Sequence, residues 1–357
     1  MITTIIPTFR RPDILGRAIE SVLAQSYGNL KIAVYDNASG DETEAVVRDY
    51  MRRDARVMYR ANPTNLGPVR NMIQGVNAVE TPYYSLLNDD DFLLPGFYEG
   101  AVRKLSANTA AMFACTKTKV INIANRSVEM RNQDWAAGFY SPDLDVVKKM
   151  YSSHFVPTGV LFRRQVRDVL GPFESSGSDS LYLTMAAAAL PFLVLDQYGG
   201  AVTLHEQAYS MVGEGINKEP IDVLYGHFLS SVSSVTAAPI TSEMKSLVLM
   251  LIVNSYHQIF DSKRLFYYLN GQNESGIEQL LIFPSLITNR GLVNKFYNSS
   301  PACFRPLLRY FYGAFSTYNK KRAMKRQVGC ALPEVAAEML KIKQVDYSEL
   351  FRTVAQG

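Results

Sequence analysis

Three aspartates stand side by side at positions 89 to 91, directly after the apolar run Tyr83–Leu87. Adjacent carboxylates repel one another, so such a cluster is tolerated best where a divalent cation neutralises it. Because every ligand offered is an oxygen atom, Mg²⁺ or Mn²⁺ suits the cluster better than zinc or copper. A solvated acidic turn ahead of the next helix is an equally good interpretation of the cluster by itself.

Apolar runs with strand character alternate with helix-like stretches over the first 115 residues. Strands are predicted at Ile2–Phe9, Leu30–Tyr35, Val57–Arg60, Tyr83–Leu87 and Ala111–Ala114. Helices are predicted at Pro12–Ser26, after the turn Asp36–Thr43, at Pro68–Val79 and at Pro95–Ser106, with Asp41 and Glu44 as a capping box for the second. Helices of this length between strands predict βαβ units and a mostly parallel sheet.

The side chains that could bind a ligand or take part in catalysis follow the carboxyl ends of these strands. They are Pro7-Thr8-Phe9, Asp36-Asn37 and Asn88-Asp89-Asp90-Asp91. Open parallel sheets bind their ligands at that edge, so the three groups are expected to converge there.

The later part of the chain gives a weaker pattern. Val120–Ala124 and Val128–Met130 are predicted to pair as a hairpin, and Asp179–Leu190 to form a helix. Gly213–Pro220 has the composition of a linker, and residues 221–357 look mainly helical and rich in aromatic side chains. Two domains are therefore expected, 1–220 and 221–357.

Composition excludes several protein classes. The chain has 357 residues, of which 47% are hydrophobic and 20% charged, which describes a globular protein with a full core rather than a disordered, collagen-like or coiled-coil chain. The three cysteines are far apart, which argues against a disulfide scaffold or a cysteine-based zinc site. No targeting segment or membrane-length apolar run is visible, so a cytoplasmic location is expected.

Positive charge gathers near the C-terminus. Residues 279–333 hold nine Lys or Arg, no acidic residue, and several aromatic side chains. A helix over Leu307–Tyr318, followed by clustered cations, would suit peripheral docking on an anionic membrane, here the inner face of the cell membrane. Packing of the aromatic side chains on the catalytic domain is the alternative. Nucleic acid is not expected as a partner, because the whole chain is only +4.

Five segments resemble, in order and spacing, the inverting family-two glycosyltransferases. They are Ile5–Arg11, Leu15–Tyr27, Tyr35–Thr43, Asn65–Asn71 and Leu87–Asp91 followed by Pro95. The resemblance implies a GT-A fold of the α/β class, a Rossmann-like, mostly parallel sheet flanked by helices, with a helical C-terminal region. It implies that residues 1–115 bind a nucleotide-sugar and that residues 116–220 form the acceptor half of the catalytic domain.

The resemblance also implies roles on the donor side. Phe9 would pack against the nucleotide base near Pro7 and Thr8, and Asp36 would accept a hydrogen bond from a base N–H, which favours uracil. Arg70 would approach the base or phosphates, and Asp89 the ribose. Ordinary core packing for Phe9, a turn for Asp36 and a solvated cation for Arg70 are the structural alternatives.

The metal ligands follow from the position of the family's DXD motif. Asn88-x-Asp90 occupies that position, but Asn88 stands where the family usually has aspartate. Asp90 is therefore the first candidate for a ligand of Mg²⁺ or Mn²⁺. Asp91 is a second candidate, because Asp89-x-Asp91 also has the DXD pattern. His205 matches a position near the diphosphate or metal, although a lone histidine is more often structural.

The catalytic base of the family is a carboxylate after a Gly-x-Phe-acid stretch. Gly171–Asp179 matches it, so Asp179 is the candidate base, with Glu174 in reserve. A helix N-cap is the alternative role for Asp179. Arg163 and Arg164 resemble a family segment beside the acceptor.

The predicted function is metal-dependent, inverting transfer of a sugar from a nucleotide-sugar to an acceptor hydroxyl. A UDP-sugar is favoured over dTDP- or GDP-sugars, the acceptor would be a glycan or a lipid-linked glycan, and the context would be surface polysaccharide or glycoconjugate biosynthesis. A catalytically impaired nucleotide-binding scaffold is the alternative, supported by Asn88. Pyrophosphorylases and dinucleotide enzymes are disfavoured, because no glycine-rich loop follows the first strand.

Overall fold

The computed structural model describes residues 1–124, 126–170, 179–205 and 221–269. The chain divides into two compact units, Met1–Ile240 and Thr241–Gly357. The strands are β1 (Ile2–Thr8), β2 (Leu30–Asp36), β3 (Val57–Ala61), β4 (Tyr83–Leu86), β5 (Phe92–Leu93), β6 (Phe113–Asn122), β7 (Ser127–Arg131), β8 (Gly138–Tyr140), β9 (Val160–Arg163) and β10 (Phe192–Leu204). The helices are α1 (Pro12–Leu23), α2 (Thr43–Arg53), α3 (Pro68–Asn77), α4 (Phe97–Ala107), α5 (Leu144–Ser152), α6 (Gln165–Leu170), α7 (Asp179–Ala189), α8 (Ile221–Ala237) and α9 (Ser242–Leu269), with a 3₁₀ turn η1 (Pro157–Gly159).

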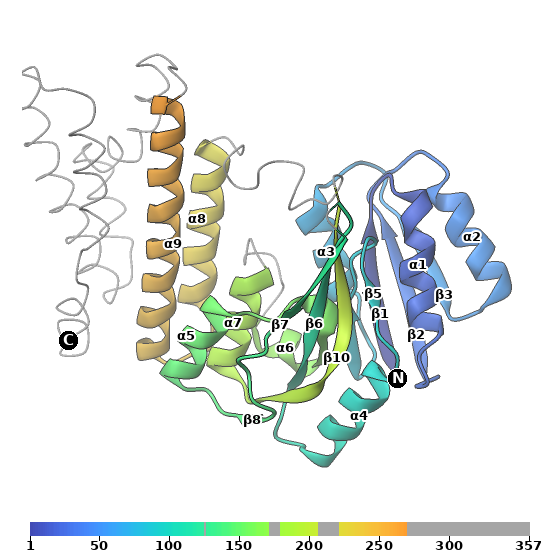
Figure 1. The fold of residues 1–357 in the computed structure, drawn as a ribbon, viewed down its shortest axis with the longest axis horizontal. Helices are drawn as coiled ribbons and strands as arrows, with labels where there is room; N and C mark the ends of the chain where they lie inside the picture. Colours follow the sequence, from blue (N-terminus) through green and yellow to red (C-terminus); the bar gives the residue numbers. More distant parts are fainter. Residues whose placement is uncertain (125, 171–178, 206–220, 270–357) are drawn as a thin grey trace, which may run out of the picture. The chain divides into compact units, whose positions relative to one another are not determined.

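All of the described strands belong to one sheet of the first unit, which Figure 1 shows with its helices. Their order is β3-β2-β1-β4-β9-β6-β10-β5. β7 pairs with β6, and β8 pairs with β10. β1 runs parallel to both β2 and β4, and β2 runs parallel to β3. β9 is antiparallel to its neighbours β4 and β6, while β6 and β10 run parallel to each other. The parallel arrangement predicted from the alternating pattern is therefore present in β1 to β4, and the later strands make the whole sheet mixed.

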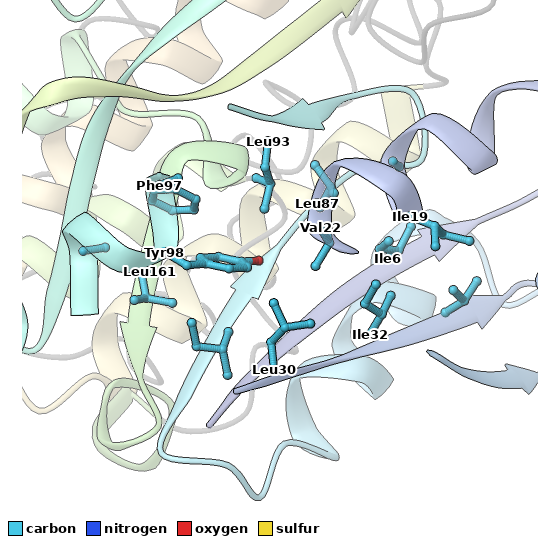
Figure 2. Packing of buried hydrophobic residues seen from close by; sticks show 14 of the residues in the cluster. Ile6, Ile19, Val22, Leu30, Ile32, Leu87, Leu93, Phe97, Tyr98 and Leu161 are labelled. Atoms are coloured by element: carbon cyan, nitrogen blue, oxygen red, sulfur yellow. The ribbon is translucent and has the colours of Figure 1, made fainter. Parts of the chain in front are cut away.

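Helices cover both faces of this sheet because its central strands are apolar on both sides. Along β1, Ile2 and Ile6 pack in a cluster with α1, α2 and α4, whereas Ile5 packs in a second cluster with α3, α5 and α7. Figure 2 shows the first cluster, in which Phe97 and Tyr98 of α4 lie over the sheet. These clusters hold the strand ends in fixed positions.

The predicted elements of the first half are confirmed, with shifts at their ends. α2 begins at Thr43, and Asp41 accepts hydrogen bonds from the Thr43 amide and hydroxyl while Glu44 pairs with Arg48. The expected capping box is therefore wrong, because an aspartate turn takes its place. α4 begins at Phe97 rather than Pro95, because Gly96 has a φ of 76° and so lies in the left-handed region, outside the helix.

The later elements are also partly confirmed. The predicted hairpin forms, since Val120 pairs with Glu129 and Ile121 with Val128 across β6 and β7. α7 matches the helix expected at Asp179–Leu190. The linker at 213–220 lies outside the described residues, so the domain boundary stays a prediction. No described helix combines the length and apolarity needed to cross a membrane.

β9 pairs with β4 and with β6, and so joins the second half of the sheet to the first. β10 lies farther along the sheet, beside the short strand β5. Gly200 and Ala201 of β10 pair with Leu93 and Phe92 of β5, only one residue beyond the aspartate cluster. A side chain at Gly200 would collide with Thr158 of η1, because a Cβ there would lie 2.7 Å from the Thr158 methyl carbon. This close approach brings β10 and η1 against the residues that follow β4.

Candidate functional site

The carboxylate loop, Asn88–Asp91, leaves β4 at the carboxyl edge of the sheet beside the end of β1. Asp89 is buried, with 4% of its surface exposed. It accepts a 2.7 Å hydrogen bond from the hydroxyl of Thr8 and a 2.8 Å bond from the Arg11 guanidinium. Burial raises the pKa of Asp89, and Arg11 and Thr8 oppose that rise. The carboxylate is therefore fixed by groups from the end of β1 and the start of α1.

Asp90 meets an arginine and a histidine, which come from the two halves of the domain. Its Oδ2 lies 2.7 Å from Arg11 Nη1 and 3.3 Å from Nε2 of His205, the residue after β10. The backbone carbonyl of Asp90 accepts hydrogen bonds from Arg17 and from the hydroxyl of Thr203. Its carboxylate and the imidazole thus share one corner of the site.

Asp91 points away from that corner. Its Oδ2 accepts hydrogen bonds from Thr158 at 2.8 Å and from the Asn88 amide at 3.2 Å, and its Oδ1 accepts from the Thr203 amide at 3.1 Å. Burial, reinforced by the charge of Asp90, raises the pKa of Asp91 to about 7. These contacts favour a role in joining the two halves. Metal ligation by Asp91 stays a prediction that they do not favour.

Asp36 lies at the end of β2 and is 3% exposed. Its Oδ1 accepts from the Ser39 amide at 3.0 Å and hydroxyl at 2.6 Å, and its Oδ2 accepts from the Tyr59 hydroxyl at 2.5 Å. Burial and this bond to Asp36 raise the pKa of Tyr59. Carboxylate oxygens have further lone pairs, so Asp36 is held in place and keeps capacity to accept from a ligand.

The loop after β1 adopts an uncommon backbone. Arg10 has a φ of 54°, in the left-handed region that costs a non-glycine residue about 1–2 kcal/mol. The turn is held by hydrogen bonds from the Arg10 amide to the Ser39 hydroxyl and from its guanidinium to the Ser39 carbonyl. Phe9 is half-buried with the Arg10 guanidinium 5.1 Å from its ring centre, while Pro7 is also half-buried. Strain of this kind is common at ligand sites.

Arg70 stands in the first turn of α3, and a chain of amides fixes that helix start. Asn37 donates to Asn65 and accepts from the Leu66 amide, both at 2.8 Å, and Asn71 donates to the Tyr35 carbonyl at 2.8 Å. The Arg70 side chain is exposed and makes no hydrogen bond or ion pair with any described residue. It is therefore a cation available to a ligand at the edge of the sheet.

The residues present fit a divalent cation only in part. Among the described residues no group of three or more His, Cys, Asp or Glu side chains has the arrangement of a metal cage. Asp89 and Asp90 nevertheless direct one oxygen each to the same cationic nitrogen of Arg11. One or two carboxylates completed by substrate phosphates is a usual way for proteins to hold Mg²⁺. The donor set therefore fits a cation that binds together with a phosphorylated ligand.

The acceptor side is described incompletely. Asp179 opens α7, but its side chain and all of Glu174 lie outside the described residues. Arg163 and Arg164 lie at the other edge of the sheet, because β9 is antiparallel to β4. Their guanidinium groups donate to the carbonyls of Ala111 and Glu80, so the two arginines join secondary elements.

Sequence reasoning missed the residues that hold the carboxylate loop. These are Arg11, Arg17, Thr158 and Thr203. Arg11 lies within the segment Ile5–Arg11 that resembles the family, directly before the Pro12 that starts α1. That position was the one sequence feature that could have marked Arg11 as a site residue. No sequence feature marked Thr158 and Thr203 in this way, since both come from distant parts of the chain.

Fold and site together define a class: an α/β protein with a charged ligand site at the carboxyl edge of the parallel strands β1 to β4. Residues 3–171, slightly less than half of the chain, match the model of glycosyl transferase family 2.

Two curated relatives and one solved structure are similar to this chain. The GalNAc(5)-diNAcBac-PP-undecaprenol beta-1,3-glucosyltransferase of Campylobacter jejuni is 33% identical over 31% of this chain and 37% of its own length. The succinoglycan biosynthesis protein ExoO of Rhizobium meliloti is 27% identical over 46% of this chain and 44% of its own. The chain thus spans less than half the length of either relative.

The solved structure is S. aureus TarS 1–349 in complex with UDP-GlcNAc. Its TM-score to this chain is 0.62, at 18% identity over 91% of both chains. This likeness concerns the fold, and it confirms the predicted GT-A class.

Proposed function

We propose that this protein transfers a sugar from a UDP-sugar to a hydroxyl of a glycan or lipid-linked acceptor, with inversion and with Mg²⁺ or Mn²⁺, in the synthesis of a surface polysaccharide or glycoconjugate. The observation that carries the proposal is the gathering of Thr8, Arg11, Asp89, Asp90 and His205 at the carboxyl edge of a family-two domain. The names of the relatives support the acceptor class, since one acts on an undecaprenol-linked glycan.

Asp36 and Phe9 would receive the nucleotide base. The Asp36 carboxylate is held by Ser39 and Tyr59, so it offers a fixed acceptor to the N–H of uracil. Phe9 supplies a partly exposed ring on which a flat heterocycle can pack. The complex of TarS with UDP-GlcNAc supports uracil as the base.

Asp89, Asp90 and His205 would hold the cation and the diphosphate. A bound Mg²⁺ or Mn²⁺ supplies positive charge against the departing diphosphate. Arg11 and Arg70 would add positive charge beside the same leaving group, the place where charge develops in the transition state. Asp89, pinned by Thr8, would be positioned near the ribose.

The acceptor hydroxyl must lose a proton as it attacks the anomeric carbon. We assign this step to Asp179, because it opens α7 at the end of the Gly171–Asp179 stretch. One new C–O bond forms on the face opposite the breaking bond to the diphosphate, which gives inversion. The proton passes from the acceptor oxygen to the Asp179 carboxylate.

A donor panel tests the proposal. Purified protein is incubated with UDP-, GDP- and dTDP-sugars, with and without Mn²⁺, and the release of nucleoside diphosphate is measured with a lipid-linked acceptor extract. We expect release from one UDP-sugar that is lost with chelator and reduced at least about 100-fold in Asp90→Ala. Asp196→Ala is the matched control, because Asp196 is exposed and its ion pair with a described residue is the one with Lys117.

The scaffold alternative rests on Asn88, whose amide bonds to Asp91 in this structure. UDP binding with no donor turnover under any condition would favour it. Full activity of Asp90→Ala, or of the wild type in excess chelator, would contradict metal dependence.

A further inference from the structure

We propose that the Arg11 guanidinium is a built-in counter-cation of the carboxylate loop: it occupies the place between Asp89 and Asp90 in the unliganded protein, and a divalent cation enters only when the donor diphosphate draws the guanidinium away. The inference rests on the proposed function, which supplies the diphosphate. It makes Arg11 a positioning residue that couples the binding of metal and donor.

The geometry places one nitrogen between two carboxylates. Arg11 Nη1 lies 2.8 Å from Asp89 Oδ1 and 2.7 Å from Asp90 Oδ2. Both aspartates are at least nine-tenths buried, and the Arg11 side chain is only 19% exposed. Arg11 immediately precedes α1, whose first residue is Pro12, so the start of the helix fixes the position of its backbone.

The charges explain why the pair of aspartates tolerates burial. Two neighbouring buried carboxylates without a cation would shift toward their protonated forms. Burial lowers the pKa of Arg11, but Asp89 and Asp90 outweigh it and raise that pKa overall, so the guanidinium stays charged. Arg11 in turn opposes the rise that burial causes in the pKa of Asp89. The guanidinium thus does in the unliganded protein what a metal ion does in the loaded one.

Arg11 and a metal ion cannot share this place. Mg²⁺ takes its oxygen ligands at about 2.0–2.1 Å, closer than the guanidinium nitrogen, and the two cations repel one another. The ion therefore has to displace Arg11 from Asp89 and Asp90, which weakens its binding by the strength of the two ion pairs.

A diphosphate changes the balance. Guanidinium groups bind phosphate oxygens with two parallel hydrogen bonds, so the donor offers Arg11 a replacement for the two carboxylates. Asp89 and Asp90 then become available to the metal ion, which the phosphates also ligate. Since the coupling between two ligands is reciprocal, the metal ion strengthens donor binding by the same factor.

The experiment measures the binding of Mn²⁺ alone, without donor, at pH 8. Free Mn²⁺ is followed by electron paramagnetic resonance during titration of wild type, Arg11→Gln and Arg11→Lys, and thermal melts check that each is folded. We expect Arg11→Gln to bind Mn²⁺ about tenfold or more tightly than wild type, since a nearby positive charge is gone. Arg11→Lys keeps the charge and should stay within about threefold of wild type.

Arg10→Gln is the matched control. Arg10 is the adjacent arginine, but its guanidinium contacts the Ser39 carbonyl and the Phe9 ring rather than the aspartates. Its loss should leave the Mn²⁺ affinity unchanged. Repeating the titrations with saturating UDP should show a large gain in Mn²⁺ affinity for wild type and a smaller gain for Arg11→Gln.

Unchanged or weaker Mn²⁺ binding by Arg11→Gln overturns the proposal, and so does an equal rise in Arg10→Gln or Arg11→Lys. If Arg11→Gln does not fold, a rise above threefold in Arg11→Lys or no effect of UDP on wild-type Mn²⁺ binding overturns it. Failure of sugar transfer in the wild type would count against the proposed function instead, because the titrations without donor do not depend on turnover.

Discussion

Asp179 is the residue to which we assign the proton of the acceptor hydroxyl. In Asp179→Asn the amide keeps the shape of the side chain but cannot take a proton. We expect the rate of sugar transfer to fall about 100- to 10,000-fold while UDP binding, measured by calorimetry, is retained. Asp168→Asn, an exposed change on α6, should leave transfer unaffected.

A comparison with Glu174→Gln tests whether Asp179 is the catalytic base. If Glu174→Gln abolishes transfer and Asp179→Asn remains active, the base is Glu174 and the assignment to Asp179 is wrong. Loss of UDP binding in Asp179→Asn would show instead that its role is structural, as a cap for α7.

Asp91 joins elements that are far apart in the sequence. We expect its titration to make the free energy of unfolding depend on pH. Its folded pKa of about 7 exceeds the ordinary 3.8, so between these values the folded protein holds a proton that the unfolded chain has released. This contribution therefore lowers stability as pH rises from about 4 to about 7, by at most about 1.4 kcal/mol per pH unit.

Asp91→Asn removes that titration and keeps an oxygen that can accept from Thr158 or Thr203. Without divalent cations, we expect the melting temperature of the variant relative to wild type to increase from pH 5 to pH 8. A difference that stays constant across this range would show that Asp91 does not titrate there. Asp145→Asn is a suitable control, since that carboxylate is 88% exposed.

The packing of α3 against the sheet depends on Gly75. A Cβ at this position would lie 2.4 Å from Ile5 Cγ2 and 3.2 Å from the Tyr35 ring. Alanine favours a helix by about 1 kcal/mol over glycine, but this overlap should outweigh that gain. We expect Gly75→Ala to lower the free energy of unfolding by about 1–3 kcal/mol in urea denaturation.

Gly28→Ala is the control for that experiment, because nothing lies within 4 Å of its would-be Cβ. It should change the free energy of unfolding by less than about 0.5 kcal/mol. Equal stability of Gly75→Ala and wild type would mean that α3 moves easily away from β1 and β2. Such movement would also displace Arg70, which stands on the same helix.

At the scale of the whole molecule, the basic segment 279–333 lies outside the described residues, and its role stays a prediction. If it docks on membranes, the protein should sediment with liposomes that contain anionic lipid, and less so at high salt. Replacing Lys320, Lys321, Arg322, Lys325 and Arg326 by Gln should abolish sedimentation. Absence of binding at low salt, or binding unchanged in this variant, would favour packing on the catalytic domain.

Much of the fold could be predicted from local patterns. The strands and helices of the first half follow from the spacing of apolar residues, and their alternation implies a mostly parallel sheet. Parallel strands bring their carboxyl ends to one edge, so Thr8, Asp36 and Asp89 could be grouped before any coordinates were known. The short strand β5 and the aspartate turn before α2 could not, because both depend on neighbours that local pattern does not specify.

The sequence by itself determined which residues reach the carboxyl edge, since strand ends and turn chemistry are local properties. Only the tertiary structure decided what each carboxylate does there. Asp91 is turned inward because Thr158 and Thr203 arrive from segments more than sixty residues away, and Asp89 and Asp90 meet one Arg11 nitrogen because α1 begins beside the loop. Three adjacent aspartates are alike in sequence; they differ in the structure because each faces a different part of the chain.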